Sequence, residues 1–332
     1  MSGEILRQVR LARAPDSYPV TGDFDLVEAP LPVPADGEVL CRTRWLSLDP
    51  YMRSQIAGRH LTGAIGPGDP MRGETVSEVL ESRHPAFAPG QLVRCFGGWQ
   101  THSLHPAGEL SPVDERIRPP SLALSLLGMT GLTAWAGMVW QARVGEGDQV
   151  LVPAVTGAVG SAAAQFCRLF GAEVVGTAGT PEKCRWAEAS LGVRRCIDRR
   201  AEDLPAALDA AFPDGIDVYF DLVGGELLHL ASERLARNAR IELAGLVSEI
   251  NAAERAPGPP PGLWIRARAT VHGLVVYDFE ARRDEFIDAC LPRVADGALS
   301  QREDVSEGLE AAPAAFCRLL RGENFGKTLV RP

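Results

Sequence analysis

A strand, a glycine turn and a helix follow one another near residues 150–170, and this succession constrains the fold most. The apolar run Val150-Leu-Val-Pro153 leads into Ala154-x-x-Gly157-x-x-Gly160, and residues 162–170 have a helical pattern. Such a turn directs backbone N–H groups and a helix N-terminus toward one point, which suits a pyrophosphate. Gly157 lets phosphate oxygens approach the backbone, and Gly160 lets the helix pack on the strand. Because Ala154 occupies the first position, the strict dinucleotide fingerprint is not met.

The next apolar strand, residues 172–179, ends without an acidic residue. In an NAD site an acid stands about 20 residues beyond the glycines and binds the ribose 2′-hydroxyl. Here the chain reads Gly179-Thr-Pro-Glu-Lys183, and Lys183 is one of only two lysines among 34 basic residues. Loss of the acid removes repulsion against a 2′-phosphate, and a lysine adds a compensating charge, so NADP(H) is favoured over NAD(H). The alternative is that Lys183 is a solvated residue in the first turn of a helix.

The composition limits the classes of partner. A net charge of −9 argues against nucleic acid, because phosphate neutralisation needs a basic surface. No apolar run approaches the length of a membrane span, and the N-terminus lacks the apolar core of a signal peptide. Seven scattered cysteines without a Cys-x-x-Cys pair suit reduced thiols. The sequence therefore predicts a cytoplasmic protein without a membrane or nucleic-acid partner.

The pattern of apolar, proline and glycine residues changes near residue 126. Residues 1–125 contain short apolar runs separated by Pro and Gly, which indicates an irregular β domain. Residues 126–297 alternate helical patterns with short apolar strands, which predicts a doubly wound parallel sheet. The expected strands of that sheet are residues 149–153, 173–177, 216–221, 240–245 and 270–276. Residues 298–332 form a C-terminal segment whose last strand is expected near 324–331 and returns to the first domain.

Several kinds of chemistry find little support in the sequence. A catalytic zinc needs three Cys, His or Glu ligands, and the close pair His102 and His105 lies in a strand-like segment that points them to opposite faces. The sequence contains no Gly-x-Ser-x-Gly motif, which a serine hydrolase of the α/β-hydrolase type would need at its nucleophile. Gly326-Lys-Thr328 has the letters of a phosphate loop but leads into a strand. Of the kinds of chemistry considered, hydride transfer with a bound nicotinamide is the one that the sequence supports.

A hydride-transfer site also needs a polar group near the charge that develops on the substrate. The candidates in loops and turns are Tyr51, Arg53, Thr133, Ser248, Tyr277 and Asn324. Taken singly, each is also consistent with a structural role, since a tyrosine in an apolar stretch is more often a packed aromatic than a proton donor.

Motifs along the whole chain resemble the zinc-free medium-chain dehydrogenase/reductase superfamily, and within it the NADPH-dependent alkenal/one and prostaglandin reductases. The matching segments are Asp49-Pro-Tyr-Met-Arg53, Leu127-Gly-Met-Thr-Gly-Leu-Thr-Ala-Trp135, residues 154–161, 179–184 and 219–225, the Pro-rich run 257–261, and Gly322-Glu-Asn-Phe-Gly-Lys327. The resemblance implies a GroES-like domain built from both chain ends and a Rossmann domain between them. It also implies that NADPH reduces the C=C bond of an α,β-unsaturated ketone or aldehyde, with hydride going to the β-carbon.

The resemblance also implies roles for individual residues. Residues 157–160 hold the pyrophosphate, Lys183 the 2′-phosphate, and Met129 and Thr133 border the nicotinamide. The full set of predicted cofactor contacts is Met129, Thr133, Gly157, Ala158, Val159, Gly160, Lys183, Arg199, Leu222, Gly245, Leu246, Val247, Ser248, Leu274, Val275, Val276 and Asn324. Tyr51 is the predicted catalytic side chain, and a homodimer through the sheet edge near residues 270–276 is expected.

Three positions depart from the family pattern. Arg199 replaces a tyrosine, and its guanidinium suits phosphate still better. Leu222 replaces an asparagine, which removes a hydrogen-bonding side chain near the ribose. Ile250 replaces a tyrosine that lies near phosphate or enolate oxygen; if that tyrosine donates the proton in the family, the proton must come here from water, a ribose hydroxyl or Tyr51. Two rivals stay open: a quinone reductase of the same superfamily, and a cofactor-binding homologue without turnover, which Leu222 and Ile250 favour.

Overall fold

The computed structural model describes residues 4–252 and 257–332. Residues 1–3, at the start of the expected N-terminal domain, and residues 253–256 lie outside the described residues. The chain forms two compact units, one of residues 1–125 and 303–332 and the other of residues 126–302. None of the described helices is long and apolar enough to cross a membrane.

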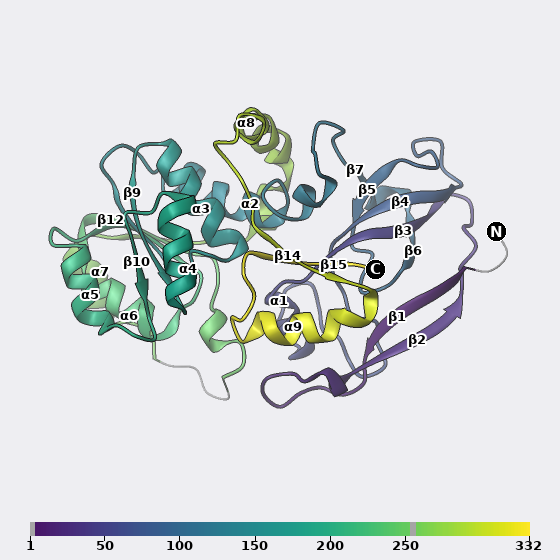
Figure 1. Ribbon diagram of the computed structural model, residues 1–332, viewed down its shortest axis with the longest axis horizontal. Helices are drawn as coiled ribbons and strands as arrows, with labels where there is room; N and C mark the ends of the chain where they lie inside the picture. The colour runs from purple at the N-terminus through teal and green to yellow at the C-terminus, as the bar shows by residue number, and fades with distance from the viewer. Residues whose placement is uncertain (1–3, 253–256) are drawn as a thin grey trace. The chain divides into compact units, whose positions relative to one another are not determined.

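The second unit is built on a six-stranded parallel sheet in the order β10-β9-β8-β11-β12-β13. Figure 1 labels β9, β10 and β12 of this sheet. This is the order expected of a Rossmann sheet, in which the chain starts in the middle and reverses its direction of travel once. The predicted doubly wound fold is confirmed. Its strands are β8 (Gln149–Val152), β9 (Glu173–Ala178), β10 (Arg195–Asp198), β11 (Ile216–Asp221), β12 (Leu235–Leu243) and β13 (Thr270–Gly273).

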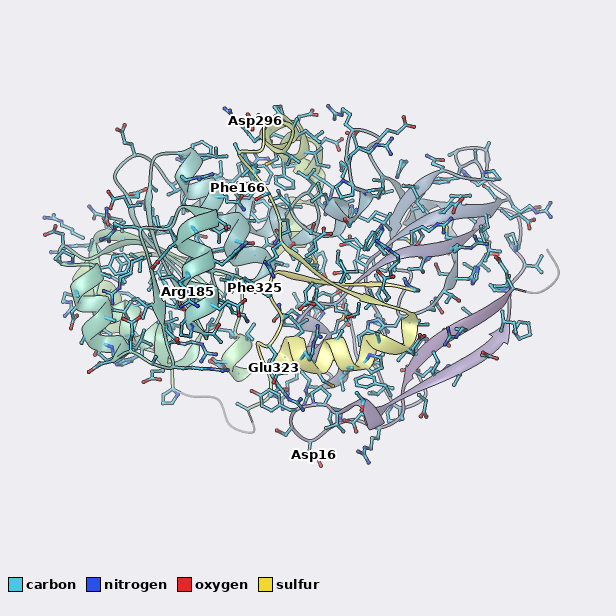
Figure 2. All side chains as sticks on the ribbon, viewed as in Figure 1. Asp16, Phe166, Arg185, Asp296, Glu323 and Phe325 are labelled. Atoms are coloured by element: carbon cyan, nitrogen blue, oxygen red, sulfur yellow. The ribbon has the colours of Figure 1, made fainter. Side chains whose placement is uncertain are left out.

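Helices cover both faces of this sheet. Alternate strand residues such as Leu151, Tyr219 and Ile241 join one buried cluster with side chains of α5, α6 and α7. On α2 and α3, Trp135 and Phe166 meet edge to face with ring centroids 5.1 Å apart (Figure 2 labels Phe166). The helices are α2 (Met129–Trp135), α3 (Ala158–Leu169), α4 (Pro181–Trp186), α5 (Leu204–Ala211), α6 (Gly225–Glu233), α7 (Pro261–Ala267) and α8 (Arg283–Ala295).

Two strand predictions need correction. The strand expected over 270–276 ends at Gly273, and a 3₁₀ segment, Val276–Arg282, follows. In that segment Phe279 stacks on Trp140, with centroids 5.7 Å apart, and Arg282 lies 3.8 Å from the Trp140 ring centroid, so tertiary packing overrides the β preference of the valines. The strand β10 was not predicted, because its short apolar core is flanked by charged residues.

The first unit is an irregular β structure, as the GroES-like pattern predicts. A seven-stranded sheet has the order β14-β15-β3-β4-β5-β7, with β6 paired to β3, and β1 and β2 form a separate hairpin. Its elements are β1 (Ile5–Leu11), β2 (Phe24–Pro30), β3 (Glu38–Ser47), α1 (Tyr51–Ile56), β4 (Thr75–Ser82), β5 (Leu92–Cys95), β6 (His102–Pro106), β7 (Ser111–Pro112), β14 (Glu303–Glu307), α9 (Ala312–Leu320) and β15 (Lys327–Arg331).

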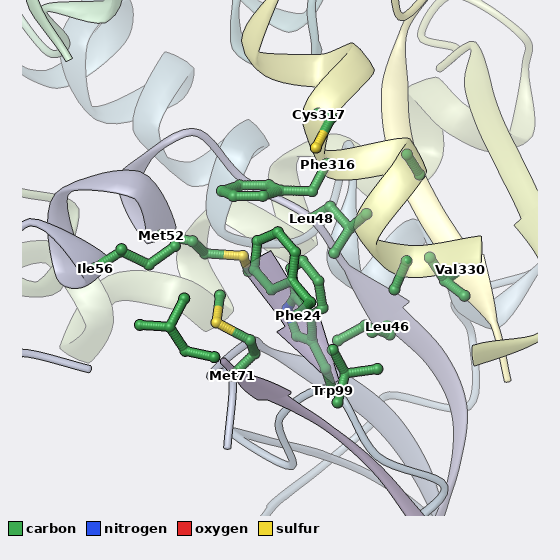
Figure 3. Packing of buried hydrophobic residues seen from close by; sticks show 14 of the residues in the cluster. Phe24, Leu46, Leu48, Met52, Ile56, Met71, Trp99, Phe316, Cys317 and Val330 are labelled. Carbon is green, nitrogen blue, oxygen red and sulfur yellow. The ribbon is translucent and has the colours of Figure 1, made fainter. Parts of the chain in front are cut away.

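An aromatic core joins the two ends of the chain within this unit. Phe24 stacks on Trp99 at 5.6 Å between centroids, and Phe316 of α9 meets the Trp99 ring edge to face at 5.4 Å (Figure 3). Leu48 and Met52, on either side of the start of α1, belong to the same buried cluster. The C-terminal strand β15 pairs with β3, so residues more than 280 positions apart share one sheet. This core holds α1 and its first residue, Tyr51.

Candidate functional site

Most of the predicted contact residues lie at the carboxyl ends of the parallel strands. The loops after β8, β9, β11 and β12 all leave the sheet at this edge, because neighbouring strands run in the same direction. The chain reverses its direction of travel between β8 and β11, and open α/β sheets bind their ligands at that point.

The glycine turn between β8 and α3 is tight. Gly157 is the N-cap of α3, and its N–H donates to Ala154 O at 2.8 Å. A Cβ on Gly160 would lie 2.5 Å from Ala154 O and 2.9 Å from Val155 Cα, so only glycine permits this approach of helix to turn. Ala154 itself has φ of +48°, in the left-handed region where the fingerprint places glycine. The turn therefore keeps the fingerprint geometry despite the alanine, and it presents a helix N-terminus suited to a pyrophosphate.

Positive charge gathers at the end of β9. Thr180 caps α4 by accepting a hydrogen bond from Lys183 N at 3.3 Å. A Cβ on Gly179 would lie 3.5 Å from Arg200 Nε and 3.8 Å from Arg199 Nη2. These two arginines follow β10, and neither makes an ion pair within the described residues. Arg199 and Arg200 lie beside Gly179, and Lys183 is in α4, the helix that follows β9. We call these three residues the cationic cluster; their charges suit a phosphate group.

Arg200 was missed by the sequence reasoning. It comes to Gly179 because β10 pairs with β9, with Asp198 opposite Ala178. Asp198 Oδ1 accepts a hydrogen bond from Arg200 N at 3.0 Å, which shapes the turn that carries both arginines. Had β10 been predicted as a strand beside β9, Arg200 would have been expected near Gly179.

The loops after β11 and β12 lock together. Asp221 Oδ1 accepts from Val223 N at 2.9 Å, from Gly224 N at 2.8 Å and from Tyr219 Oη at 2.9 Å. Burial raises the pKa of the Asp221 carboxyl above its usual range. Ser248 Oγ donates to Val223 O at 2.6 Å, so the second loop is tied to the first.

These bonds bring four more predicted residues to the same edge. Gly245 N donates to Asp221 O at 3.1 Å, and a Cβ on Gly245 would lie 3.1 Å from Leu222 O. Leu246 and Val247 are 43% and 39% exposed, so their side chains are accessible to a ligand at this edge. Ile250 follows this loop and is half-buried.

Leu274, Val275 and Val276 follow β13. Leu274 N donates to Leu243 O at 2.9 Å, which continues the sheet by one residue. A Cβ on Gly137 would lie 3.1 Å from Leu274 Cδ1, so this segment packs against the continuation of α2. On α2 the Thr133 hydroxyl donates to Met129 O at 2.8 Å, which leaves its oxygen lone pairs as acceptors.

Tyr51 and Asn324 belong to the other unit. Asn324 Nδ2 donates to Gly326 O at 2.8 Å and so closes the turn before β15. Tyr51 begins α1 and stacks on His60, with ring centroids 4.9 Å apart. Arg53, in the same helix, is buried and donates to Pro15 O and Ser17 O, so its role is structural. Across residues 4–252 and 257–332, no three His, Cys, Asp or Glu side chains are arranged to hold a metal ion.

Two known protein families match the chain. The N-terminal domain of oxidoreductase matches residues 7–113, and the zinc-binding dehydrogenase family matches residues 158–292. The NADPH-dependent curcumin reductase of Escherichia coli is 38% identical over 97% of this chain and 95% of its own length. Prostaglandin reductase 1 of Bos taurus is 39% identical over 95% of each chain. The NADP(+)-dependent 2-alkenal reductase of Nicotiana tabacum is 34% identical over 98% of this chain and 96% of its own length.

Solved structures agree with these relatives. CurA from Vibrio vulnificus, alone and in complex with NADPH, is 37% identical and has a TM-score of 0.93 over 98% of each chain. The Escherichia coli quinone oxidoreductase, at 19% identity and a TM-score of 0.79, shares the fold. The chain belongs to the zinc-free medium-chain dehydrogenase/reductases, in the family of the NADPH-dependent alkenal/one reductases.

Proposed function

We propose that this protein uses NADPH to reduce the C=C bond of α,β-unsaturated ketones and aldehydes. The observation that carries the proposal is the cationic cluster beside Gly179, at the position where an NAD site has an acid. The names of the relatives supply the reaction class, since they include curcumin, prostaglandin and 2-alkenal reductases.

The described residues fit this cofactor. The N–H groups at the start of α3 receive the pyrophosphate, and Gly157 and Gly160 keep side chains out of its way. Arg199, Arg200 and Lys183 bind the 2′-phosphate, because guanidinium and ammonium groups neutralise its charge. The loops that carry Leu222 and residues 245–248 border the ribose and nicotinamide. The remaining predicted contacts, Met129, Thr133, residues 274–276 and Asn324, are assigned by family resemblance.

Bound NADPH supplies a hydride to the β-carbon of the substrate. Negative charge then develops on the carbonyl oxygen, and a hydrogen-bond donor fixed near that oxygen lowers the barrier. The Tyr51 hydroxyl is the donor that we assign to this role. Because Ile250 has no hydroxyl, the α-carbon takes its proton from water or from a ribose hydroxyl.

The test is a panel of acceptors incubated with purified protein and NADPH. We expect loss of absorbance at 340 nm with enones and enals. Mass spectrometry should then detect the saturated carbonyl product. Turnover of quinones alone would reassign the protein to quinone reduction. Tight NADPH binding without reduction of any acceptor would leave a cofactor-binding protein.

We also propose a homodimer formed through β13. This strand ends the six-stranded sheet, and the described residues place no strand on its outer side. Leu274 N donates to Leu243 O of β12. Because the N–H groups of successive residues in a strand point to opposite sides, the N–H of Val271 points away from β12, toward the free edge of the sheet. Val271→Pro should therefore shift the mass measured by light scattering from dimer to monomer, whereas Val271→Ala should not. A monomeric wild-type protein at micromolar concentration would refute the dimer.

The cysteines support a reducing compartment. All seven are free thiols and all are buried. We infer residence in the cytoplasm, where such thiols stay reduced. Fractionation of cells that express the tagged protein tests this location.

A further inference from the structure

The loop after α1 places a histidine ring against the proposed catalytic tyrosine. His60 stacks on Tyr51 with an interplanar angle of 30° and 4.9 Å between ring centroids. Both rings are half-buried. The two residues are nine positions apart, and Tyr51 begins α1 (Tyr51–Ile56) whereas His60 follows its end, so the pairing depends on how the turn after α1 folds.

Hydrogen bonds to the ring determine where its proton lies. Thr62 N donates to His60 Nδ1 at 3.2 Å, and a backbone amide has no other role than donor. Thr62 Oγ1 lies 2.8 Å from the same nitrogen. Gln55 Nε2 donates to Thr62 Oγ1 at 2.8 Å, so the threonine hydroxyl is left to donate its own hydrogen to the ring. Nδ1 is therefore an acceptor, and the neutral ring carries its hydrogen on Nε2.

The opposite ring nitrogen is available to a ligand. Nε2 makes no hydrogen bond with any described residue, although Nδ1 is fully engaged. Burial lowers the pKa of His60 below its usual range, which keeps the ring neutral at pH 7. A neutral imidazole held in one tautomer is a directed N–H donor.

We infer that His60 Nε2–H donates a hydrogen bond to the carbonyl oxygen of the unsaturated substrate, beside Tyr51. The inference rests on the proposed double-bond reduction. Its ligand is the carbonyl oxygen of an enone or enal, because that oxygen gains negative charge as the reaction proceeds.

The electron count of the step is simple. Hydride brings an electron pair to the β-carbon, the C=C pair moves between the α-carbon and the carbonyl carbon, and the C=O pair moves to oxygen. The enolate oxygen accepts hydrogen bonds from His60 and Tyr51, and the Nε2 hydrogen stays on nitrogen. A proton from water then bonds to the α-carbon and the C=O bond re-forms, so His60 ends the cycle unchanged.

Two substitutions separate the donor from the ring. His60→Phe keeps a ring that can stack on Tyr51 but has no N–H, whereas His60→Gln keeps an N–H donor and loses the ring. His84→Phe is a matched control, because His84 Nδ1 also accepts from a backbone amide two residues on, at 3.2 Å, and contacts an aromatic side chain, Phe87.

The variants are compared with 3-penten-2-one as probe at saturating NADPH. We expect His60→Phe to lower kcat about a hundredfold, the usual effect of removing one oxyanion donor, with unchanged affinity for NADPH. His60→Gln should retain most of the activity, and His84→Phe all of it. Equal kcat for His60→Phe and wild type would overturn the inference, and so would equal losses in His60→Phe and His60→Gln.

A second measurement does not depend on turnover or on the stability of a variant. In wild-type protein labelled with ¹⁵N-histidine, the His60 resonances should report a neutral ring protonated at Nε2. A ring protonated at Nδ1 would contradict the inference. If wild-type protein reduces no acceptor, the proposed function falls as well; if it reduces enones but His60→Phe is unimpaired, only the role of His60 falls.

Discussion

Lys327 Nζ lies 2.5 Å from Asp49 Oδ1 in the interior of the first unit, and the lysine side chain is 1% exposed. Lys327 also donates to Ser47 Oγ at 2.7 Å and to Leu48 O at 3.2 Å. The pair ties the first residue of β15 to the segment that leads into α1. It therefore anchors Tyr51 through the backbone, without any contact with the tyrosine itself.

Replacement of Lys327 by Met should destabilise the protein strongly. Removing one partner of a buried ion pair leaves an uncompensated charge, which costs about 3–5 kcal/mol. Urea denaturation followed by tryptophan fluorescence measures the change. Arg293→Met is the control, since both side chains of its ion pair with Asp296 are at least half exposed and the pair should contribute little. Equal stability of the two variants would show that the buried pair does not make this contribution to the free energy of unfolding.

Removal of the cationic cluster should alter the choice of cofactor. Lys183→Ala and Arg199→Ala should each raise the Kd for NADPH about tenfold or more, because each loses a charge-assisted hydrogen bond worth about 1.5–3 kcal/mol. The Kd for NADH should hardly change, since NADH has no 2′-phosphate. Fluorescence titration with both cofactors provides the measurement, and Arg185→Ala on the exposed side of α4 is the control (Figure 2). Equal loss of both cofactors would mean that these residues do not bind the 2′-phosphate.

An added methyl group at Gly160 should disrupt the glycine turn. The new Cβ would meet backbone atoms of Ala154 and Val155, which move less easily than a side chain. We expect Gly160→Ala to cost about 1–3 kcal/mol of stability. It should also weaken NADPH and NADH alike, because both carry the pyrophosphate. At Gly145 nothing lies within 4 Å of an added Cβ, so Gly145→Ala should change stability and cofactor affinity little. Thermal denaturation and cofactor titration of both variants provide the measurement.

Loss of the Tyr51 hydroxyl should affect turnover more than binding. Tyr51→Phe keeps the ring that stacks on His60 and removes the proposed donor. We expect kcat with an enone to fall by about 10²-fold, the range known for oxyanion donors, with no change in the Kd for NADPH. Steady-state kinetics and a binding titration separate the two effects. A variant with wild-type kcat would exclude Tyr51 from the reaction.

The pH dependence of stability should reveal Glu242. Burial raises the pKa of this β12 carboxyl from 4.5 to about 7, although His272 Nδ1 lies 2.7 Å from its Oε1 and Arg240 is nearby. Between pH 4.5 and 7 the folded state therefore holds a proton that the unfolded state has lost, and this contribution to the free energy of unfolding declines as pH rises.

The Gln variant should remove that slope. Glu242→Gln cannot ionise, so it should be more stable than wild type at pH 8 by an amount on the order of 2–3 kcal/mol, and similar to it at pH 5. Urea midpoints at pH 5, 6, 7 and 8 test this. A wild-type profile that rises from pH 5 to 8 would contradict a buried, protonated Glu242.

Local patterns were enough for the glycine turn between β8 and α3 and for the strand that precedes it. The apolar run before Ala154 and the spacing of Gly157 and Gly160 predicted a strand, a turn and a helix, because steric and hydrogen-bonding demands of this turn are local. The helix starts at Ala158, four residues before the predicted run, since Gly157 rather than a later residue is its N-cap.

Edge strands and charged neighbours were harder to predict. The β10 segment is short and has arginine and aspartate at its ends, so its sequence shows little periodicity, yet pairing with β9 makes it a strand. That pairing brings Arg200 to Gly179 and completes the cationic cluster. The strand expected through Val276 stops at Gly273, because an aromatic contact with Trp140 draws the following residues into a 3₁₀ turn.

The sequence by itself determined the kind of cofactor site, its preference for a 2′-phosphate and the family, because these depend on short motifs with local geometry. Only the tertiary structure decided which distant residues act together. The lysine at 327 meets Asp49 across 278 positions, and the tautomer of His60 depends on the fold of its loop. Such partners follow from the burial of charge and the pairing of strands, and both are contacts between segments that no local pattern encodes.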